Sequence, residues 1–246
     1  MSSLAIQRRF RPGIWPTVAV LILFPLFIRL GVWQLDRAEE KREIIETHES
    51  RMQKPRLMID ENIRVDDGMN YRRVIINGNY DSEHQILLDN QIHNGVAGYN
   101  VLTPLQIGTS ERWVLVNRGW VPLGMSRKEL PDIELKQAPV SATGLFKRPM
   151  QDQFVIKGGN VWDKQWPQVI QWLKLDEIET ELGREFLPYI VLLSPDAPGG
   201  YIREWALIAS SPEKSESYAV QWFTFAAILL GLYFFLNYKK VQPGER

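Results

Sequence analysis

The stretch from Gly13 to Leu35 reads "GIWPTVAVLILFPLFIRLGVWQL" and contains one charged residue, Arg29. A helix needs about 20 apolar residues to cross the hydrocarbon core of a bilayer, and this stretch lacks the polar face of a surface helix. The charged segment that follows, "DRAEEKRE" from Asp36, provides no small-residue cleavage site of a signal peptide. We therefore interpret residues 13–35 as an uncleaved transmembrane helix.

A second apolar stretch lies near the C-terminus, where "YAVQWFTFAAILLGLYFFLN" runs from Tyr218 to Asn237 without a charge. Arginines precede the first stretch and lysines follow the second, and loops rich in Lys and Arg stay in the cytoplasm. We expect both termini to be cytoplasmic and the chain to be a multi-pass protein of the inner (plasma) membrane, held in its lipid bilayer. The expected divisions are a tail at 1–12, spans at 13–35 and 218–237, a periplasmic domain at 36–217, and a tail at 238–246.

Composition excludes several classes of function. The 246 residues have a formal net charge of zero, so nothing indicates nucleic-acid binding. The chain has no Cys, which excludes disulfides, thiolate metal sites and cysteine nucleophiles. Phosphate-loop, dinucleotide-binding, HExxH and GxSxG motifs are missing. The histidines lack a clustered carboxylate pattern, so we expect no catalytic residues and no metal site, and interpret His84 and His93 as surface or hairpin residues.

The segment between the spans predicts a β-rich domain. Residues 36–50 carry mixed charges and extend the first helix out of the membrane. Short runs rich in Val, Ile and Trp follow, and the pairs Asn77–Gly78, Asn94–Gly95 and Gly158–Gly159 are turn signals between them. "LDEIETELG" is the clearest helix of the domain, with Asp176 as a candidate cap and Gly183 as a candidate end. The expected fold is two transmembrane helices flanking an extracytoplasmic α+β domain that is an antiparallel barrel or sandwich.

Trp and Gln stand together at the outer end of each span, first as Trp33–Gln34 and then, reversed, as Gln221–Trp222. One interpretation is an aromatic belt at the headgroup level. The other is a packed polar cluster that faces a partner or a ligand, because an amide in lipid needs a hydrogen-bond partner. Arg29 either snorkels to the headgroups or pairs with an anionic group. The candidate cofactor-binding residues are therefore Arg29, Trp33, Gln34, Tyr218, Gln221 and Trp222.

The expected outer domain has its own candidate in "VLVNRGWVP", from Val114 to Pro122. It is either a structural corner or a surface for a partner. In the first interpretation Gly119 bends the strand, Trp120 covers the core and Arg118 pairs with an acid.

Several fragments in order resemble the Surfeit locus protein family of cytochrome c oxidase assembly factors. These are "LGVWQLDR", "YRRVIINGNYD", "GYNVLTPL", "VLVNRGWVP", "VSATGLFKRP" and "PEKSESYAVQWFTFA". The resemblance covers nearly the whole chain. It implies a membrane protein, not an enzyme, that assists the insertion of haem a into the catalytic subunit of the oxidase or stabilises that subunit. The implied partners are the catalytic subunit and haem a synthase.

The chain departs from the family three residues before the Tyr of "YAVQW". The resemblance implies a His there, as a ligand of haem iron, but this chain has Ser215. Tyr218 is an alternative oxygen ligand. The departure leaves two hypotheses open: the protein meets haem a without histidine ligation, or it is a haem-independent membrane scaffold that recruits other assembly proteins of the respiratory complex.

Overall fold

The computed structural model describes residues 7–124, 127, 129–135, 139–149, 160–163, 165–205 and 211–241. The chain divides into two compact units. The first, which we call the helical hairpin, comprises residues 1–46 and 208–246, and the second, the barrel domain, comprises residues 47–207.

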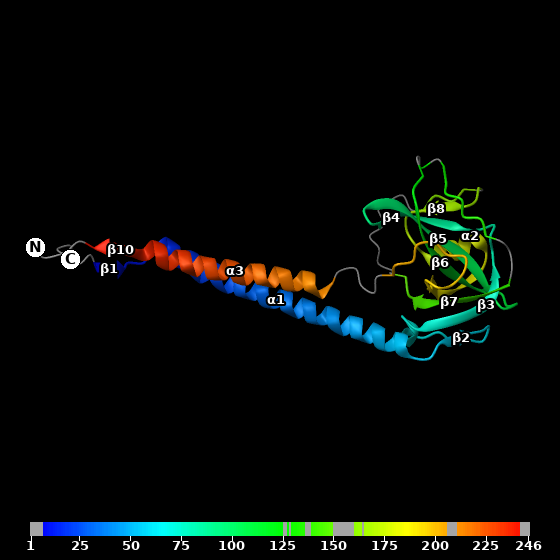
Figure 1. Ribbon diagram of the computed structural model, residues 1–246, viewed down its shortest axis with the longest axis horizontal. Coiled ribbons are helices and arrows are strands. Elements are labelled where there is room, and N and C mark those ends of the chain that lie inside the picture. Colours follow the sequence, from blue (N-terminus) through cyan, green and yellow to red (C-terminus); the bar gives the residue numbers. More distant parts are fainter. Residues whose placement is uncertain are drawn as a thin grey trace, which may run out of the picture. The chain divides into compact units, whose positions relative to one another are not determined.

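Two long helices form the helical hairpin, α1 (Ile14–Gln53) and α3 (Pro212–Asn237), and the last residues of α1 belong to the second unit. They lie side by side and antiparallel, and the short strands β1 (Gln7–Phe10) and β10 (Tyr238–Val241) pair beyond them (Figure 1). Each helix is long and apolar enough to cross a membrane. Helix α1 continues far past Leu35, as the mixed charges of residues 36–50 predict.

A heptad spacing defines the contact between the two helices, which we call the seam. On α1 the less exposed positions recur three and four residues apart, at Thr17, Val20, Phe24, Phe27, Gly31, Gln34, Ala38, Lys41 and Ile45. On α3 the matching positions are Ser215, Ala219, Trp222, Ala226, Leu230, Tyr233 and Asn237. A seam with this period is typical of helices packed nearly antiparallel.

The barrel domain contains eight paired strands and two short helical segments among its described residues. They are β2 (Leu57–Ile59), η1 (Asp67–Met69), β3 (Arg73–Tyr80), β4 (Ile86–His93), β5 (Val96–Ile107), β6 (Arg112–Pro122), β7 (Pro139–Lys147), β8 (Gln168–Ile170), α2 (Leu175–Leu182) and β9 (Glu185–Leu193). The strand order is β2-β3-β7-β9-β6-β5-β4-β8.

An additional pairing of β3 with β5 closes five of these strands into a barrel, in the order β3-β7-β9-β6-β5. Strands β7, β3, β5 and β6 pair antiparallel in the order of a Greek key. Strand β9 completes the barrel between β7 and β6, and it pairs parallel with β6. The structure has the barrel, which is one of the two alternatives that the sequence leaves open, and the predicted antiparallel pairing is confirmed for most of its strand pairs.

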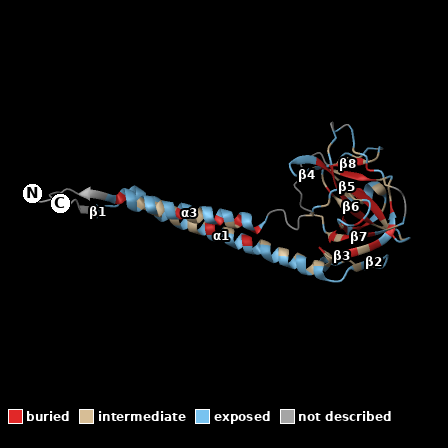
Figure 2. Ribbon diagram, viewed as in Figure 1, coloured by how far each residue is buried: buried red, intermediate tan, exposed pale blue. Residues whose placement is uncertain are grey.

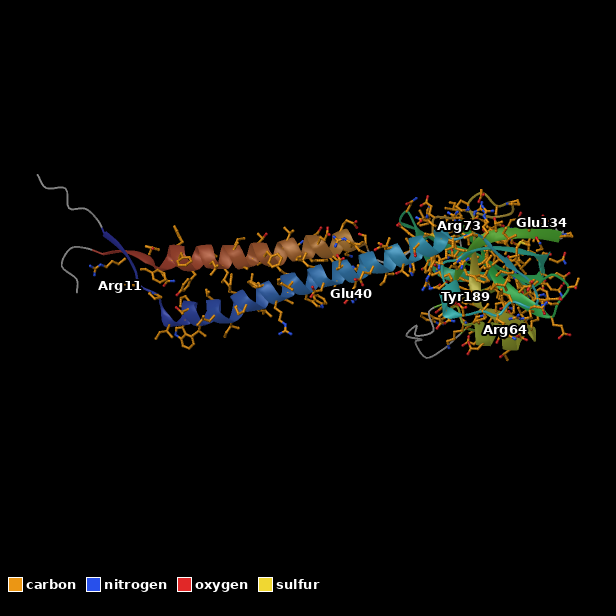
Figure 3. The ribbon with its side chains drawn as sticks, turned by 90° about the horizontal axis from the view of Figure 1, so that it is seen from below. Arg11, Glu40, Arg64, Arg73, Glu134 and Tyr189 are labelled. Carbon is orange, nitrogen blue, oxygen red and sulfur yellow. The ribbon has the colours of Figure 1, made fainter. Side chains whose placement is uncertain are left out.

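The barrel interior is filled by apolar side chains from all five strands, including Ile76, Leu105, Val116, Phe146 and Tyr189. Buried residues concentrate in this domain, whereas both long helices are mostly exposed (Figure 2). Figure 3 shows Tyr189 inside the dense side-chain packing of the barrel domain. Exposed apolar surface on both helices is what a bilayer would cover.

Two of the expected local signals differ from the structure. Asn77–Gly78 lies inside β3 and does not form a turn. Glycine is needed at position 78 because the backbone passes so close to Gln106 that a Cβ would meet the Gln106 carbonyl oxygen. Asp176 lies in the first turn of α2, and Lys174 is the residue at its N-cap.

Other local signals are confirmed. Asn94–Gly95 forms the turn between β4 and β5, with positive φ at both residues. Gly183 ends α2 in the left-handed conformation. Gly158–Gly159 lies outside the described residues.

Candidate functional site

The structure separates the two Trp–Gln pairs into residues that face the seam and residues that face outward. Gln34 and Trp222 occupy seam positions, whereas Trp33 is 52 % exposed and Gln221 is also exposed. The Phe27 ring lies 5.8 Å from the Trp222 ring, so aromatic packing joins the helices at this height. Each pair therefore has one residue that packs the hairpin and one that is free to meet lipid or a partner.

The remaining candidate cofactor-binding residues of the hairpin are exposed. Tyr218 is 44 % exposed, and Arg29 lies on the side of α1 that is opposite the seam. Arg29 and Trp33 share a side of α1, as their four-residue spacing predicts. The six candidates do not form one enclosed pocket: two belong to the seam and four lie on the surface of the hairpin.

Ser215 faces the seam, although the family resemblance implies a ligand at this position. It is 5 % exposed, and its hydroxyl accepts a hydrogen bond of 2.9 Å from the Nζ amine of Lys41. Next to it, Arg42 forms an ion pair with Glu216. A side chain at position 215 is thus directed at α1.

Close packing of small residues lets the helices approach each other. Gly31 is buried, and a Cβ there would lie 2.6 Å from the ring of Phe223. Ala38 and Ala219 are each 1 % exposed. Small residues at such positions are typical of helix pairs within membranes.

In the barrel domain, Arg118 is a buried cation that is held by neutral groups. Its Nε donates to the Gly199 carbonyl at 2.7 Å, and its Nη1 donates to the Gln85 side-chain oxygen at 2.7 Å. Its guanidinium lies over the Tyr201 ring, 5.1 Å from the centroid. Burial lowers the pKa of Arg118, and the nearby tyrosines oppose that change.

The corner interpretation predicts an acid as the partner of Arg118, and this prediction is wrong. Among the residues that the structure describes, no carboxylate lies within ion-pair distance of Arg118. Carbonyl and amide oxygens and an aromatic face compensate its charge instead. Burial raises the pKa of the neighbouring Tyr80 to about 12, although the positive charge of Arg118 acts to lower it.

Gly119 and Trp120 join β6 to the segment around residue 202. Gly119 has a φ of 114°, and a Cβ there would lie 2.6 Å from the Ile202 carbonyl oxygen. The Trp120 amide donates to that oxygen at 2.7 Å, and its indole donates to the Gln91 carbonyl at 3.0 Å. Together with the Arg118–Gly199 hydrogen bond, these contacts hold the C-terminal part of β6 against the segment around residue 202.

A polar cluster around Asp81 was not predicted from the sequence. The Asp81 carboxylate accepts hydrogen bonds from His84 at 2.6 Å and from Arg184 at 2.5 Å. Arg184 also lies over the Trp113 ring, 4.1 Å from its centroid. Burial opposes the ionisation of Asp81, but the hydrogen bonds from Arg184 and His84 outweigh it and lower the Asp81 pKa.

No group of three or more His, Asp or Glu side chains that could hold a metal ion occurs among the described residues. The Asp81 cluster joins residues 103 positions apart in the sequence. A search for Asp and His on one loop could have found Asp81 and His84, but the partner Arg184 depends on the fold.

Comparisons with known proteins point to one family. A SURF1-like protein of Monosiga brevicollis is 23 % identical over 222 residues, which cover 85 % of this chain and 83 % of that protein. A SURF1-like protein of Rickettsia felis is 30 % identical over 105 residues, which cover 42 % of this chain and 45 % of that one. The yeast relative, named cytochrome oxidase assembly protein SHY1, is 24 % identical over 148 residues, covering 58 % and 37 %.

The family model matches more of the chain than most of these pairwise comparisons. It extends over residues 21–227, from within α1, through the barrel domain, into α3. Both structural units therefore contribute to the match, and the chain belongs to the SURF1 family.

Proposed function

We propose that this protein is a membrane-anchored assembly factor for haem-copper cytochrome c oxidase. The observation that carries the proposal is the family match across both units, together with the name of the yeast relative, which is a cytochrome oxidase assembly protein. The protein holds the catalytic subunit in a state that is competent to receive its cofactors. Haem a synthase is its second proposed partner.

The proposed location is the inner membrane, with both termini in the cytoplasm and the barrel domain in the periplasm. Pairing of β1 with β10 supports an even number of crossings, because it brings the N-terminal end of α1 and the C-terminal end of α3 together. The arginines before α1 and the lysines after α3 support a cytoplasmic position for that end.

The hairpin does not fit a haem that is ligated by a histidine of this chain. Position 215 faces the seam and holds the Lys41 amine, and residues 14–46 and 211–241 contain no His. Ser is a poor ligand of haem iron. Tyr218 is the alternative oxygen ligand on the hairpin.

Contact with haem a is instead proposed for the exposed aromatic surface at the outer end of the hairpin. Tyr218 and Phe225 are one heptad apart and so lie on the same side of α3, where each is nearly half exposed. Trp33 is exposed at a similar height on α1, because Gly31 lies against Phe223. Aromatic rings of this kind suit a flat apolar macrocycle.

A haem-independent scaffold is the second candidate function. The orientation of Ser215 favours it, because the position that the family resemblance assigns to the ligand contributes to helix packing in this chain. A scaffold would need only the partner-facing surfaces of the hairpin and the barrel domain.

A deletion strain tests the proposal. Loss of the protein should lower cytochrome c oxidase activity and the amount of haem a per catalytic subunit, and the wild-type chain should restore both. Normal oxidase activity without the protein would contradict the assembly role.

Haem a that co-purifies with the wild-type chain, and is lost in the Trp33→Ala/Tyr218→Ala variant, would favour haem contact over the scaffold. A Val220→Ala variant, which alters an exposed residue on the side of α3 opposite Tyr218 and Phe225, is the control.

A further inference from the structure

Arg29 is a charged residue within the apolar stretch of α1, and no residue that the structure describes neutralises it. It is exposed, and it makes no hydrogen bond or ion pair to a described residue. The apolar parts of the two helices, residues 13–35 and 217–237, contain no Asp or Glu. An uncompensated cation in a span is costly, so such residues mark functional contacts with a partner.

The side of α1 that carries Arg29 has the pattern of a second helix-packing face. Exposed residues recur there at alternating spacings of four and three, and the resulting set, which we call the outer stripe, consists of Val18, Ile22, Pro25, Arg29, Val32 and Asp36. Helical phase puts this stripe opposite the seam, and therefore away from α3. A heptad spacing of this kind matches a further helix packed lengthwise.

The direction of the Arg29 side chain favours a protein partner over the lipid headgroups. Arg29 lies six residues before Leu35, or about 9 Å along the helix from the nearer end of the span. Side chains on a helix lean toward its N-terminus, which here is toward the middle of the bilayer. Snorkelling to the nearer headgroups would therefore run against the direction in which the side chain leaves α1.

A second copy of this chain cannot supply the missing charge. Two α1 helices pairing through the outer stripe would put two Arg29 residues at the same height. The nearest carboxylate of the stripe, Asp36, lies seven residues away, or about 10 Å along the axis. The complementary charge must come from a different chain.

We propose that the outer stripe of α1 is the docking surface for a transmembrane helix of another protein, which carries an Asp or Glu at the height of Arg29. The apolar members of the stripe pack against that helix, and the bidentate pairing of guanidinium with carboxylate fixes its register. The inference is independent of the proposed oxidase role, because it rests on the charge and exposure of α1 alone.

In-cell photo-cross-linking tests the docking surface. Benzoylphenylalanine is introduced at Ile22 or Val32 in the outer stripe, with Ile228 on the outer face of α3 as the control position. The stripe positions should cross-link to one membrane protein whose captured span contains an acid, and the control position should not. Arg29→Leu should lower the yield by about tenfold or more, whereas Arg29→Lys should retain part of it.

Charge exchange then makes the result specific. Arg29→Asp should abolish the cross-link, and replacing the partner's acid by Arg should restore it. A captured span without an acid, an undiminished yield in Arg29→Leu, or adducts with lipid only would overturn the proposal. A partner that is not an oxidase subunit would leave the docking surface standing and contradict only the proposed function.

Discussion

The Nζ amine of Lys41 on α1 donates a hydrogen bond of 2.9 Å to the hydroxyl of Ser215 on α3. This contact fixes the direction of residue 215 toward the neighbouring helix. It also explains why Lys at position 41 is tolerated in the seam, since the amine meets the Ser215 hydroxyl and lies near the Ser211 carbonyl at 3.4 Å. The contact makes position 215, where the family resemblance implies a ligand, part of the packing of the hairpin.

Ser215→His should therefore loosen the hairpin without creating a haem ligand. The larger ring replaces a small buried side chain, and it meets the Lys41 ammonium, so overpacking should cost about 1–3 kcal/mol. The purified variant, expressed with haem a synthesis, should melt at a lower temperature and show no absorption bands of histidine-ligated haem.

Two variants control for the size of the new side chain. Ser215→Ala removes the hydrogen bond alone and should cost about 1 kcal/mol, while Ser217→His adds a ring at an exposed position nearby and should change little. Histidine ligation in Ser215→His would show that the hairpin opens to admit haem, and would refute the closed seam.

Ala38 and Ala219 should be close enough for a disulfide. Both are 1 % exposed, and they lie between the Gly31–Phe223 and Lys41–Ser215 contacts. A disulfide needs Cα atoms within about 7 Å, and the native chain has no Cys. In Ala38→Cys/Ala219→Cys, mild oxidation should remove both thiols from maleimide labelling.

Val32→Cys with Val220→Cys is the matched control, since both residues face outward and are 46 % and 64 % exposed. Its thiols should remain reactive under the same oxidation. Equal protection in both pairs would mean that chains, and not the two helices of one hairpin, are being joined.

Much of the fold could be predicted because it depends on local pattern. The hydropathy of residues 13–35 and 218–237 indicated both long helices, and alternating apolar residues indicated the strands of the barrel domain. Asn94–Gly95 and Gly183 act through positive φ, a property of the residue itself. Asn77–Gly78 was misinterpreted because Gly78 is needed for close approach to β5 and not for a turn.

The candidate sites were less predictable, because they depend on which way side chains face. Sequence spacing could not tell that Gln34 packs into the seam while Gln221 faces outward. The neutral partners of Arg118 come from two separate segments, one with Gln85 and the other with Gly199 and Tyr201, and an acid was the simpler expectation for a buried cation. The Asp81–Arg184 contact depends on the closure of the barrel.

Gly119→Ala should destabilise the barrel domain more than a glycine replacement that meets only backbone strain. The φ of 114° and the 2.6 Å approach of a Cβ to the Ile202 oxygen act together, and we expect a loss of about 2–4 kcal/mol. Denaturant unfolding of the full chain in detergent measures the change.

Gly183→Ala is the control, because its φ is also positive, at 62°, but a Cβ there would have no atom within 4 Å. It should cost about 1 kcal/mol. Similar losses in the two variants would show that the corner at Trp120 yields to the added methyl group, and that the contact with Ile202 is not a constraint.

Asp81→Asn should lower stability at neutral pH and have less effect in acid. The folded state lowers the Asp81 pKa through hydrogen bonds from Arg184 and His84 that outweigh burial. A carboxyl with a lowered pKa stabilises the fold above its unfolded pKa of about 3.9, and this contribution is lost as the pH falls through the folded value. We expect a loss of about 1–3 kcal/mol at pH 7 that shrinks below about pH 4.

Glu185→Gln removes a 73 % exposed carboxylate that lies 3.9 Å from Arg112, and should have little effect at either pH. An Asp81→Asn loss of the same size at both pH values would mean that the amide disrupts packing, and that the charge of Asp81 does not hold Arg184 in place.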